Sequence, residues 1–269
     1  MTMDLLRRDL APILPETWKR IDAEAARVLR VHLAGRKLVD FRGPFGWAFA
    51  AVNTGRLSVL GQDPVPAVAA GLRVVQPLIE VRTPILLDLL ELDAAARGGD
   101  NPNLASVVDA GERMARAEDA AIFLGYPEAG IAGIISSSPH APVVVGGAAH
   151  LPRSLVEAID TLRGSGVGGP YALALGTPLY EEVTAATEEG YPIRNRVERL
   201  LGDGRIVHGP AIPGGVLLST RGGDFELTVG QDLSIGYAFH TREQVELYLA
   251  ESFTFRVLEP GAAVHLRLA

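Results

Sequence analysis

Few residues of this sequence have the types and spacing that catalysis needs. Ser138 and His140 lie two positions apart, but no G-x-S-x-G elbow surrounds the serine and no acid is placed to orient the histidine. Adjacent glutamates occur at 181–182 and again at 188–189. Neighbouring helical positions point apart, so these pairs favour a solvated face over acid–base chemistry. No catalytic residue is therefore predicted.

Metal and nucleotide sites are equally poorly supported. The six histidines include no H-E-x-x-H pair or other short metal spacing, and the chain has no cysteine. Residues 164–169 read GSGVGG, but a helical pattern precedes them and a strand pattern follows, the reverse of a dinucleotide-binding turn. We therefore expect a glycine-rich turn here, with no metal and no cofactor.

One carboxylate stands out by its position. Residues 244–257 alternate between apolar and polar side chains, which predicts a long strand buried on one face. Glu251 falls on the apolar face, while Ser252 and Thr254 fall on the other. A buried carboxylate needs a counter-charge, so we expect Glu251 to pair with an arginine. Catalytic use would need a second ionisable group nearby.

The composition narrows the class of protein. The 269 residues allow two domains or one large mixed domain. The chain has 25 basic and 32 acidic residues, a net charge of −7, so the basic footprint of a nucleic-acid-binding protein is missing. No apolar window is long enough to span a membrane, and the amino terminus lacks the apolar core of a signal peptide. A cytoplasmic location is expected.

Periodicity predicts five helices and a buried strand between two of them. The first helix covers 17–33 and a longer one, which Asn103 can cap, covers 104–124. Three shorter helices are expected at 152–163, 178–187 and 192–201, with a strand at 171–175. Before the first helix, Pro12 and Pro15 limit the chain to a short arm.

A long excursion separates the first two helices. Residues 40–85 contain ten glycine and proline residues and only short β-prone runs. A segment of this length without its own core usually has a task such as binding a neighbour. The alternative is a loose hairpin packed on its own domain.

Four segments of the chain resemble the encapsulin shell proteins, also known as linocin-like bacteriocins. They read GRKLVDFRGPFGW at 35–47, GPYALALG at 169–176, TRGGDFELTVGQDLSIGY at 220–237 and ESFTFRVLEPGA at 251–262. The matches keep the same order from Leu5 to the C-terminus. The resemblance therefore covers essentially the whole chain.

This resemblance implies an α+β fold of the Hong Kong-97 type, as in the major capsid proteins of tailed phages. The implied parts are an N-terminal arm and helix at 1–41, an extended loop at 42–84, a peripheral domain with a spine helix at 85–126 and 220–269, and an axial domain at 127–219. Copies of the chain would form an icosahedral homo-oligomer. The extended loop would pair with a neighbouring subunit.

The family encloses a cargo enzyme through a C-terminal targeting peptide that docks on the inner wall. Carried onto this sequence, the docking site comprises Leu29, Arg36, Asp40, Asp232, Ser234, Ile235 and Tyr237. Arg36 and Asp40 would fix the direction of the peptide, or alternatively pair with each other. Because Ile235 should face the groove, Ile235→Asp is expected to empty the shell without preventing assembly.

Two further features follow from the resemblance. The segment 184–196 is similar to the axial loop around the five-fold opening, so Glu188, Glu189, Gly190 and Tyr191 are expected to line a pore. Some relatives place a flavin-stacking aromatic residue in the stretch that reads LLDLLELD here; Leu90 stands at that position. No cofactor is expected.

Two other functions stay open at this point. A phage major capsid protein has the same fold, but it commonly begins with a long scaffolding region, whereas this sequence begins with the arm and helix. A hydrolase or bacteriocin is suggested only by the older family name. The leading hypothesis is a compartment shell whose cargo is ferritin-like, a peroxidase or another redox enzyme.

Overall fold

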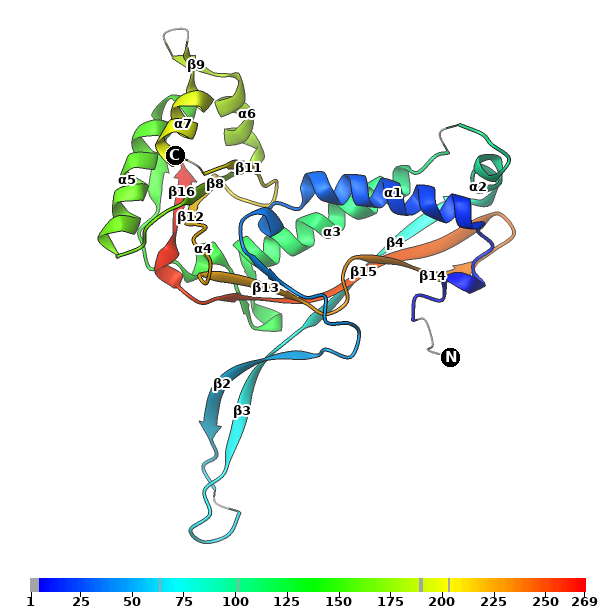
Figure 1. Cartoon of the computed structure of the whole chain (residues 1–269), viewed down its shortest axis with the longest axis horizontal. Coiled ribbons are helices and arrows are strands. Elements are labelled where there is room, and N and C mark those ends of the chain that lie inside the picture. The colour runs from blue at the N-terminus through cyan, green and yellow to red at the C-terminus, as the bar shows by residue number, and fades with distance from the viewer. Residues whose placement is uncertain (1–4, 63, 101, 189–190, 203) are drawn as a thin grey trace.

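The computed structural model describes residues 5–62, 64–100, 102–188, 191–202 and 204–269. The body of the molecule contains two five-stranded sheets and two hydrophobic clusters. One cluster spans the second sheet and continues onto residues 225–229 and 253–255 of the first, and the other covers the rest of the first sheet. A two-stranded hairpin projects from the body (Figure 1).

The first sheet is organised by the long strand β15 (Gln244–Val257), whose bounds match the sequence prediction. Strands β13 and β14 pair with successive parts of one edge of β15, β4 pairs along the other, and β1 adds in parallel to β13. These partners are β1 (Asp40–Arg42), β4 (Ile79–Asp88), β13 (Phe225–Val229) and β14 (Ser234–His240).

The prediction that only one face of β15 is buried is wrong for its second half. Leu247 and Leu249 are buried between the half-exposed Glu246 and Tyr248, but Ser252 and Thr254 are buried as well. The hydroxyl of Ser252 accepts a hydrogen bond from the Gln231 backbone, whereas the Thr254 hydroxyl has no partner among the described residues. An uncharged hydroxyl costs far less to bury than a charge, so this face can enter the core.

Helices α1 (Pro15–His32) and α3 (Ala105–Phe123) pack on each other beside this sheet. The approach is close, because a Cβ at Gly111 would lie 2.9 Å from Cγ1 of Val28. Both helices were predicted, and the Asn103 side chain accepts from the Ala105 backbone at the start of α3. The short α2 (Leu89–Ala96) was missed, because its eight residues carry little amphipathic pattern. None of the described helices is long and apolar enough to cross a membrane.

The second sheet has the order β11-β8-β12-β16-β7. Its strands are β7 (Val143–Val145), β8 (Tyr171–Leu175), β11 (Ile206–His208), β12 (Gly215–Ser219) and β16 (Ala263–Leu268). Its helices are α4 (Ile134–Ser137), α5 (Leu151–Gly164), α6 (Thr177–Ala185) and α7 (Ile193–Leu201). Two short pairs join β5 (Gly125–Tyr126) to β6 (Ile131–Ala132) and β9 (Thr187–Glu188) to β10 (Tyr191–Pro192).

The sequence predictions for this part are largely confirmed. The strand 171–175 is correct to the residue, and GSGVGG forms the turn between α5 and β8. Helix α6 ends two residues earlier than predicted, because Thr187 and Glu188 leave the helical path to pair in β9.

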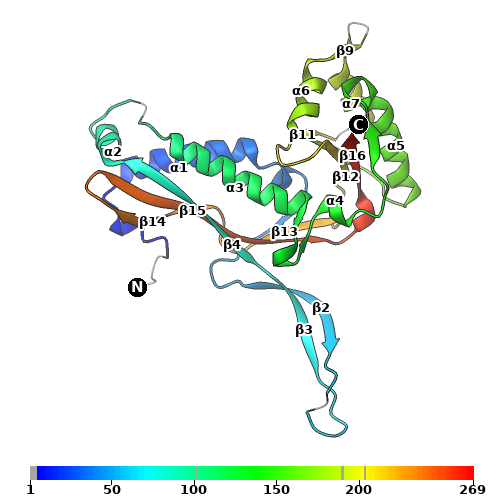
Figure 2. The same cartoon turned by 180° about the vertical axis from the view of Figure 1, so that it is seen from behind.

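The excursion forms a hairpin that stands clear of the body in both views (Figures 1 and 2). Strand β2 (Ala51–Val59) pairs antiparallel with β3 (Gly71–Pro77), with an irregularity between Asn53 and Arg56. Near its base, Gln76 donates to the Gly130 carbonyl. Most of its residues are exposed, so the alternative of a hairpin packed on its own domain is wrong.

Candidate functional site

A single arginine, Arg36, joins four segments of the chain. It lies in a short 3-10 turn, Gly35–Lys37, just after α1. Its Nε and Nη2 donate to the carboxylate of Glu118 on α3 at 2.7 to 3.0 Å. Its Nη1 donates to Asp232 at 2.9 Å, and its Nη2 also donates to Glu251 on β15. We call these four residues the Arg36 cluster.

The backbone beside Arg36 is held by the next residue of α3. The two carboxylate oxygens of Asp119 accept from the backbone N–H groups of Ala34 and Gly35 at 3.0 and 2.8 Å. A Cβ at Gly35 would lie only 2.5 Å from the Ile122 side chain, so glycine permits this close approach. Adjacent acids on one helix thus bind the backbone and the side chain of a single turn.

Three carboxylates face one guanidinium in the Arg36 cluster. Glu118 and Glu251 are fully buried, whereas the Asp232 side chain is 40% exposed. Burial, with the nearby Glu118 charge, raises the pKa of Glu251 well above the ordinary glutamate value. Glu251 Oε2 accepts no hydrogen bond from a described residue. Arg36 thus pairs with both buried glutamates, while burial disfavours the ionised form of Glu251.

Asp119 is a second carboxyl with a perturbed pKa. Burial raises the pKa of Asp119 to about 7, even though the two backbone N–H groups favour its charged form. The same helix therefore carries two buried acids next to each other, and only Glu118 has an arginine partner. The expected pairing of Glu251 with an arginine is confirmed.

Two apolar members of the expected docking site lie in the core. Leu29 is 8% and Ile235 is 3% exposed, and both belong to the hydrophobic cluster under α1 and β14. The expectation that Ile235→Asp spares assembly is therefore wrong, because a carboxylate there would be buried without a partner. An apolar residue that lines a groove and one that fills a core look alike in a sequence.

The polar members near β14 lie at the surface side of this cluster. Asp232 Oδ1 accepts from Arg36 and from the Leu233 backbone, while Oδ2 accepts no hydrogen bond from the described residues. The Ser234 hydroxyl donates to the Asp232 carbonyl at 2.7 Å. The hydroxyl of Tyr237 lies 2.7 Å from Nδ1 of His240. Asp232 thus offers a free acceptor beside apolar surface.

Asp40 forms no hydrogen bond with Arg36. Its carboxylate accepts from the backbone of Gly223 at 2.6 Å, and no bond joins it to Arg36. The alternative that these two residues simply pair is therefore wrong. Leu90, at the position of the flavin-stacking residue, is 73% exposed on α2.

The expected pore residues lie in or next to the β9–β10 pair. Glu188 pairs in backbone register with Tyr191, whereas Glu189 and Gly190 lie outside the described residues. Tyr191 is 52% exposed, and its hydroxyl accepts from Arg199 at 2.8 Å. Figure 1 shows this pair at the tip of the lobe formed by the second sheet.

Ser138 and His140 do not form a nucleophile and base. The serine hydroxyl donates to the Ala263 carbonyl at 2.7 Å, and Nε2 of the histidine lies 3.0 Å from the carbonyl of Gly261. Both side chains therefore secure the segment that leads into β16.

Sequence comparison assigns the family. Residues 3–254 match the family described as encapsulating protein for peroxidase. A type 1 encapsulin shell protein of Rhodospirillum rubrum is 46% identical, over 98% of this chain and 97% of that protein. Another, from Brevibacterium linens, is 42% identical over 99% and 100%. The chain belongs to the encapsulin shell proteins.

Structural comparison gives the fold. The virus-like particle protein of Pyrococcus furiosus aligns with a TM-score of 0.66 over 94% of this chain and 100% of that one, at 14% identity. A chain of the capsid of Myoviridae phage XM1 aligns with a TM-score of 0.55 over 88% of this chain and 92% of that one, at 13% identity. This encapsulin therefore has the predicted Hong Kong-97-type fold. High identity to encapsulins and low identity to phage capsids favour the compartment shell over the phage capsid.

Sequence reasoning missed Glu118 of the Arg36 cluster and Asp119, which binds the backbone beside Arg36. Glu118 and Asp119 are adjacent acids near the end of a helix, a pattern that usually marks a solvated face. Their burial could have been predicted from their apolar neighbours in the sequence, since Ala115, Ile122 and Phe123 on the same helix are buried.

The raised pKa values predict how stability depends on pH. A carboxyl whose pKa is higher in the folded chain destabilises the fold once ionised, so the free energy of unfolding should fall as pH rises from about 4 toward the raised pKa. Glu251→Gln removes one such group and keeps an acceptor for Arg36. We expect the fall between pH 5 and 8 to be smaller than in the wild-type protein, in urea unfolding followed by circular dichroism.

The matched control is Glu80→Gln. Glu80 forms a surface ion pair with Arg82, with 44% and 53% of the two side chains exposed. This variant should keep the wild-type dependence on pH. An unchanged slope in Glu251→Gln would show that Glu251 is ionised throughout this range.

Proposed function

We propose that this encapsulin assembles with copies of itself into a closed shell that encloses a cargo enzyme. The observation that carries the proposal is the projecting hairpin. Leu57, Val59 and Leu72 are 67%, 79% and 61% exposed, and they lie beyond the reach of either hydrophobic cluster. A two-stranded hairpin is marginal on its own, and apolar surface of this kind marks an interface.

The shape of the hairpin fits binding between subunits. Its strands project from the body, so it can reach across a neighbouring copy (Figure 2). Register places Leu57 opposite Arg73 and Val59 opposite Gly71, which puts both apolar side chains on one face. Ser58 and Leu72 share the other face. A neighbour that covers both faces would bury apolar side chains, at about 1.5 to 3 kcal/mol for each one.

The double variant Leu57→Asp with Val59→Asp tests assembly. Both side chains are exposed in the single subunit, so its own stability should change by only about 0.5 kcal/mol. Burial of two carboxylates in an interface would cost several times more. We expect folded subunits or small oligomers in place of shells, measured by size-exclusion chromatography with light scattering and by negative-stain microscopy.

Ser58→Ala is the control for a substitution on the same strand, because it adds no charge and removes no apolar side chain. It should retain more assembly than the double variant. Deletion of residues 55–71 should abolish shells and leave soluble subunits. Uniform shells from the double variant or from the deletion would contradict the role of the hairpin.

The same proposal assigns cargo binding to the surface between α1 and β14. The site comprises the seven residues carried over from the family, with Leu29 and Ile235 in the core beneath this surface and Asp232, Ser234 and Tyr237 half-buried at it. Asp232 supports this assignment, since it is ordered by Arg36 yet keeps Oδ2 free for a donor of the peptide. Asp40 follows Arg36 on the same segment of the subunit and would contact a different part of the peptide.

Asp232→Asn tests the cargo site. The amide keeps the size of the side chain and an acceptor for Arg36, but it removes the negative charge from the partly exposed side chain. We expect shells to form in normal yield with severalfold less cargo. The measurement is the ratio of cargo to shell protein in particles purified from the native organism, by gel densitometry.

The matched control is Glu243→Gln, which removes a negative charge from an exposed residue in the turn before β15. It should leave the loading unchanged. Full loading of Asp232→Asn shells would remove Asp232 from the cargo site. Loss of the shells themselves would assign it to folding through Arg36.

The remaining parts of the proposal concern the entry of ions into the shell, the domain limits and the place of catalysis. The tip that carries β9 and β10 would surround the five-fold opening, and its glutamates would favour entry of cations over anions. The domain limits 1–41, 42–84, 85–126 with 220–269, and 127–219 would divide the subunit into arm, loop, peripheral and axial parts, except that β16 pairs with β12 and β7 and so goes with the axial part. A cytoplasmic shell of this kind leaves catalysis to its cargo, a peroxidase or a ferritin-like enzyme.

A further inference from the structure

Helices cover only one face of the first sheet. Leu247 and Leu249 of β15 pack in the hydrophobic cluster that includes residues of α1 and α3, and both views show these helices on one side of β4, β15 and β14 (Figures 1 and 2). The hairpin projects from the other side. On that side, the end of the sheet that carries Leu86 has no described helix over it.

Strand register places two rows of side chains on this uncovered face. Leu86 of β4 and Phe239 of β14 are both register partners of Glu246 on β15, so the three side chains point to the same side of the sheet. Leu86 is 49% and Phe239 is 53% exposed, and Glu246 lies half-exposed between them. In the next row, Pro84 pairs with Tyr248. We call the five residues of these two rows the Glu246 patch.

The carboxylate of Glu246 has no partner in the described part of the chain. No hydrogen bond or ion pair reaches it, although it lies between two large apolar side chains. By contrast, Glu80 on the same face pairs with Arg82 at 2.6 Å. A hollow of about 320 Å³, lined in part by Trp47, Arg82 and Tyr248, adjoins the patch. Exposed apolar surface with one unpaired charge indicates a binding site for a protein that brings the opposite charge.

One face of the hairpin carries the complementary side chains. Leu57 and Val59 lie on this face, and Arg73 shares it because it is the register partner of Leu57. Arg73 is exposed and forms no hydrogen bond or ion pair with a described residue. Arg56, the other charged residue of β2 and β3, lies on the opposite face with Ser58. The hairpin therefore presents two apolar side chains and one cation together.

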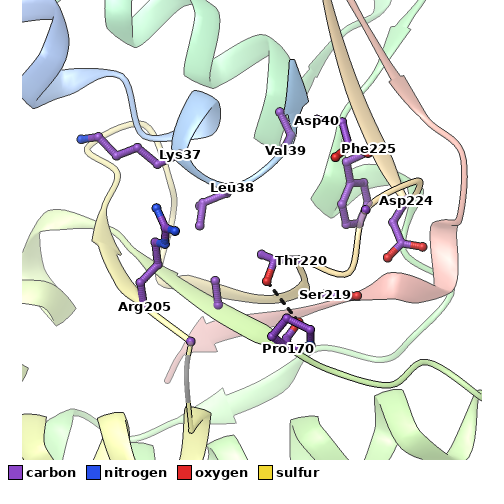
Figure 3. A pocket seen from close by; sticks show the side chains of 13 residues that line it. Lys37, Leu38, Val39, Asp40, Pro170, Arg205, Ser219, Thr220, Asp224 and Phe225 are labelled. Atoms are coloured by element: carbon purple, nitrogen blue, oxygen red, sulfur yellow. Dashed lines mark hydrogen bonds between the residues drawn. The ribbon is translucent and has the colours of Figure 1, made fainter. Parts of the chain in front are cut away.

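The hollow between the two sheets, of about 350 Å³, is another place where carboxylates lie beside apolar side chains. Figure 3 shows Asp40 and Asp224 on one side of it and Arg205 on the other. Asp224 pairs with Arg221 at 2.8 Å, and Asp40 accepts a hydrogen bond from a backbone N–H group. Both carboxylates thus have partners, unlike Glu246 among the described residues, and Arg205 would repel a second arginine. The patch is the better receptor for a cation of the hairpin.

We propose that the hairpin of one subunit binds the Glu246 patch of a neighbouring copy, with Arg73 paired to Glu246 and the apolar side chains of the two surfaces in contact. This inference rests on the role in assembly proposed above and adds the place where the hairpin binds. The hairpin stands clear of its own body, so another copy must supply the contact (Figures 1 and 2). Hairpin and patch are different surfaces of one chain, so the contact can continue from copy to copy around a closed particle.

Charge reversal tests the ion pair. Arg73→Glu and Glu246→Arg should each lower the yield of shells at least tenfold, because each variant places like charges against each other in the interface. The double variant restores opposite charges and should recover at least half of the wild-type yield. Size-exclusion chromatography and negative-stain microscopy measure the yield, and circular dichroism verifies that each subunit is folded.

The matched control combines Glu246→Arg with Arg56→Glu, which reverses the arginine on the other face of the hairpin. This combination should assemble no better than Glu246→Arg alone. Wild-type yields from both single variants at residues 73 and 246 would overturn the pairing. Failure of their combination to recover assembly would overturn it as well.

Cross-linking tests the contact in shells that have already assembled. The chain has no cysteine, so Val59→Cys with Phe239→Cys provides the only thiols for a short bis-maleimide. We expect a ladder of linked subunits on a denaturing gel, because each hairpin joins the next copy. Val59→Cys with Val156→Cys, at an exposed position of α5, is the control and should give no ladder.

The two proposals fail in different ways in this experiment. Intact shells without a ladder from the first cysteine pair would overturn the Glu246 patch as the receptor and leave the role of the hairpin in assembly standing. Wild-type protein that forms no shells would contradict the proposed function itself. A ladder from the first pair and none from the control would support the patch.

Discussion

The hydrogen bonds of the Arg36 guanidinium hold together the lobe that is built on the first sheet. Arg36 leaves α1 at a turn whose backbone is bound by Asp119, and its side chain reaches α3, β15 and the turn before β14. Loss of the arginine would leave two fully buried glutamates without a partner. The mutual position of α1, α3 and the sheet therefore depends on one polar contact inside an otherwise apolar layer.

The hairpin shows the opposite arrangement. It has almost no contact with the body beyond its base, and its apolar side chains face solvent in the isolated chain. A subunit built in this way has a stable body and one element whose stability comes from association. Folding of the body and growth of the particle can therefore proceed as separate steps, with the hairpin ordered in the second.

Local patterns in the sequence predicted the elements but not their partners. The alternation in β15 and the apolar stripes of α1 and α3 depend on neighbours a few positions apart, and the strand and the two helices that they predict are confirmed. The bonds of Arg36 join residues 82, 196 and 215 positions apart, which no local pattern records. Among these residues, only Glu251 could be predicted from the sequence to have an arginine partner, because its charge falls on the apolar face of a strand. Burial of Leu29 and Ile235 was not predictable, since residues of a groove and of a core share the same chemistry.

The order of strands within the two sheets affects how the chain can fold during synthesis. Strand β15 lies in the middle of the first sheet, and β16 lies between β12 and β7 in the second. Both strands are translated after every other described element. While the ribosome is still making residues 244–268, the first sheet has no centre and β7 has no neighbour to pair with. Neither lobe can close before this stretch has left the ribosome, although the hairpin has emerged long before. Nascent chains on one messenger would thus expose the apolar hairpin strands β2 and β3 early. No neighbouring chain would yet have a folded body for the hairpin to bind, so particle growth would wait until complete subunits are available.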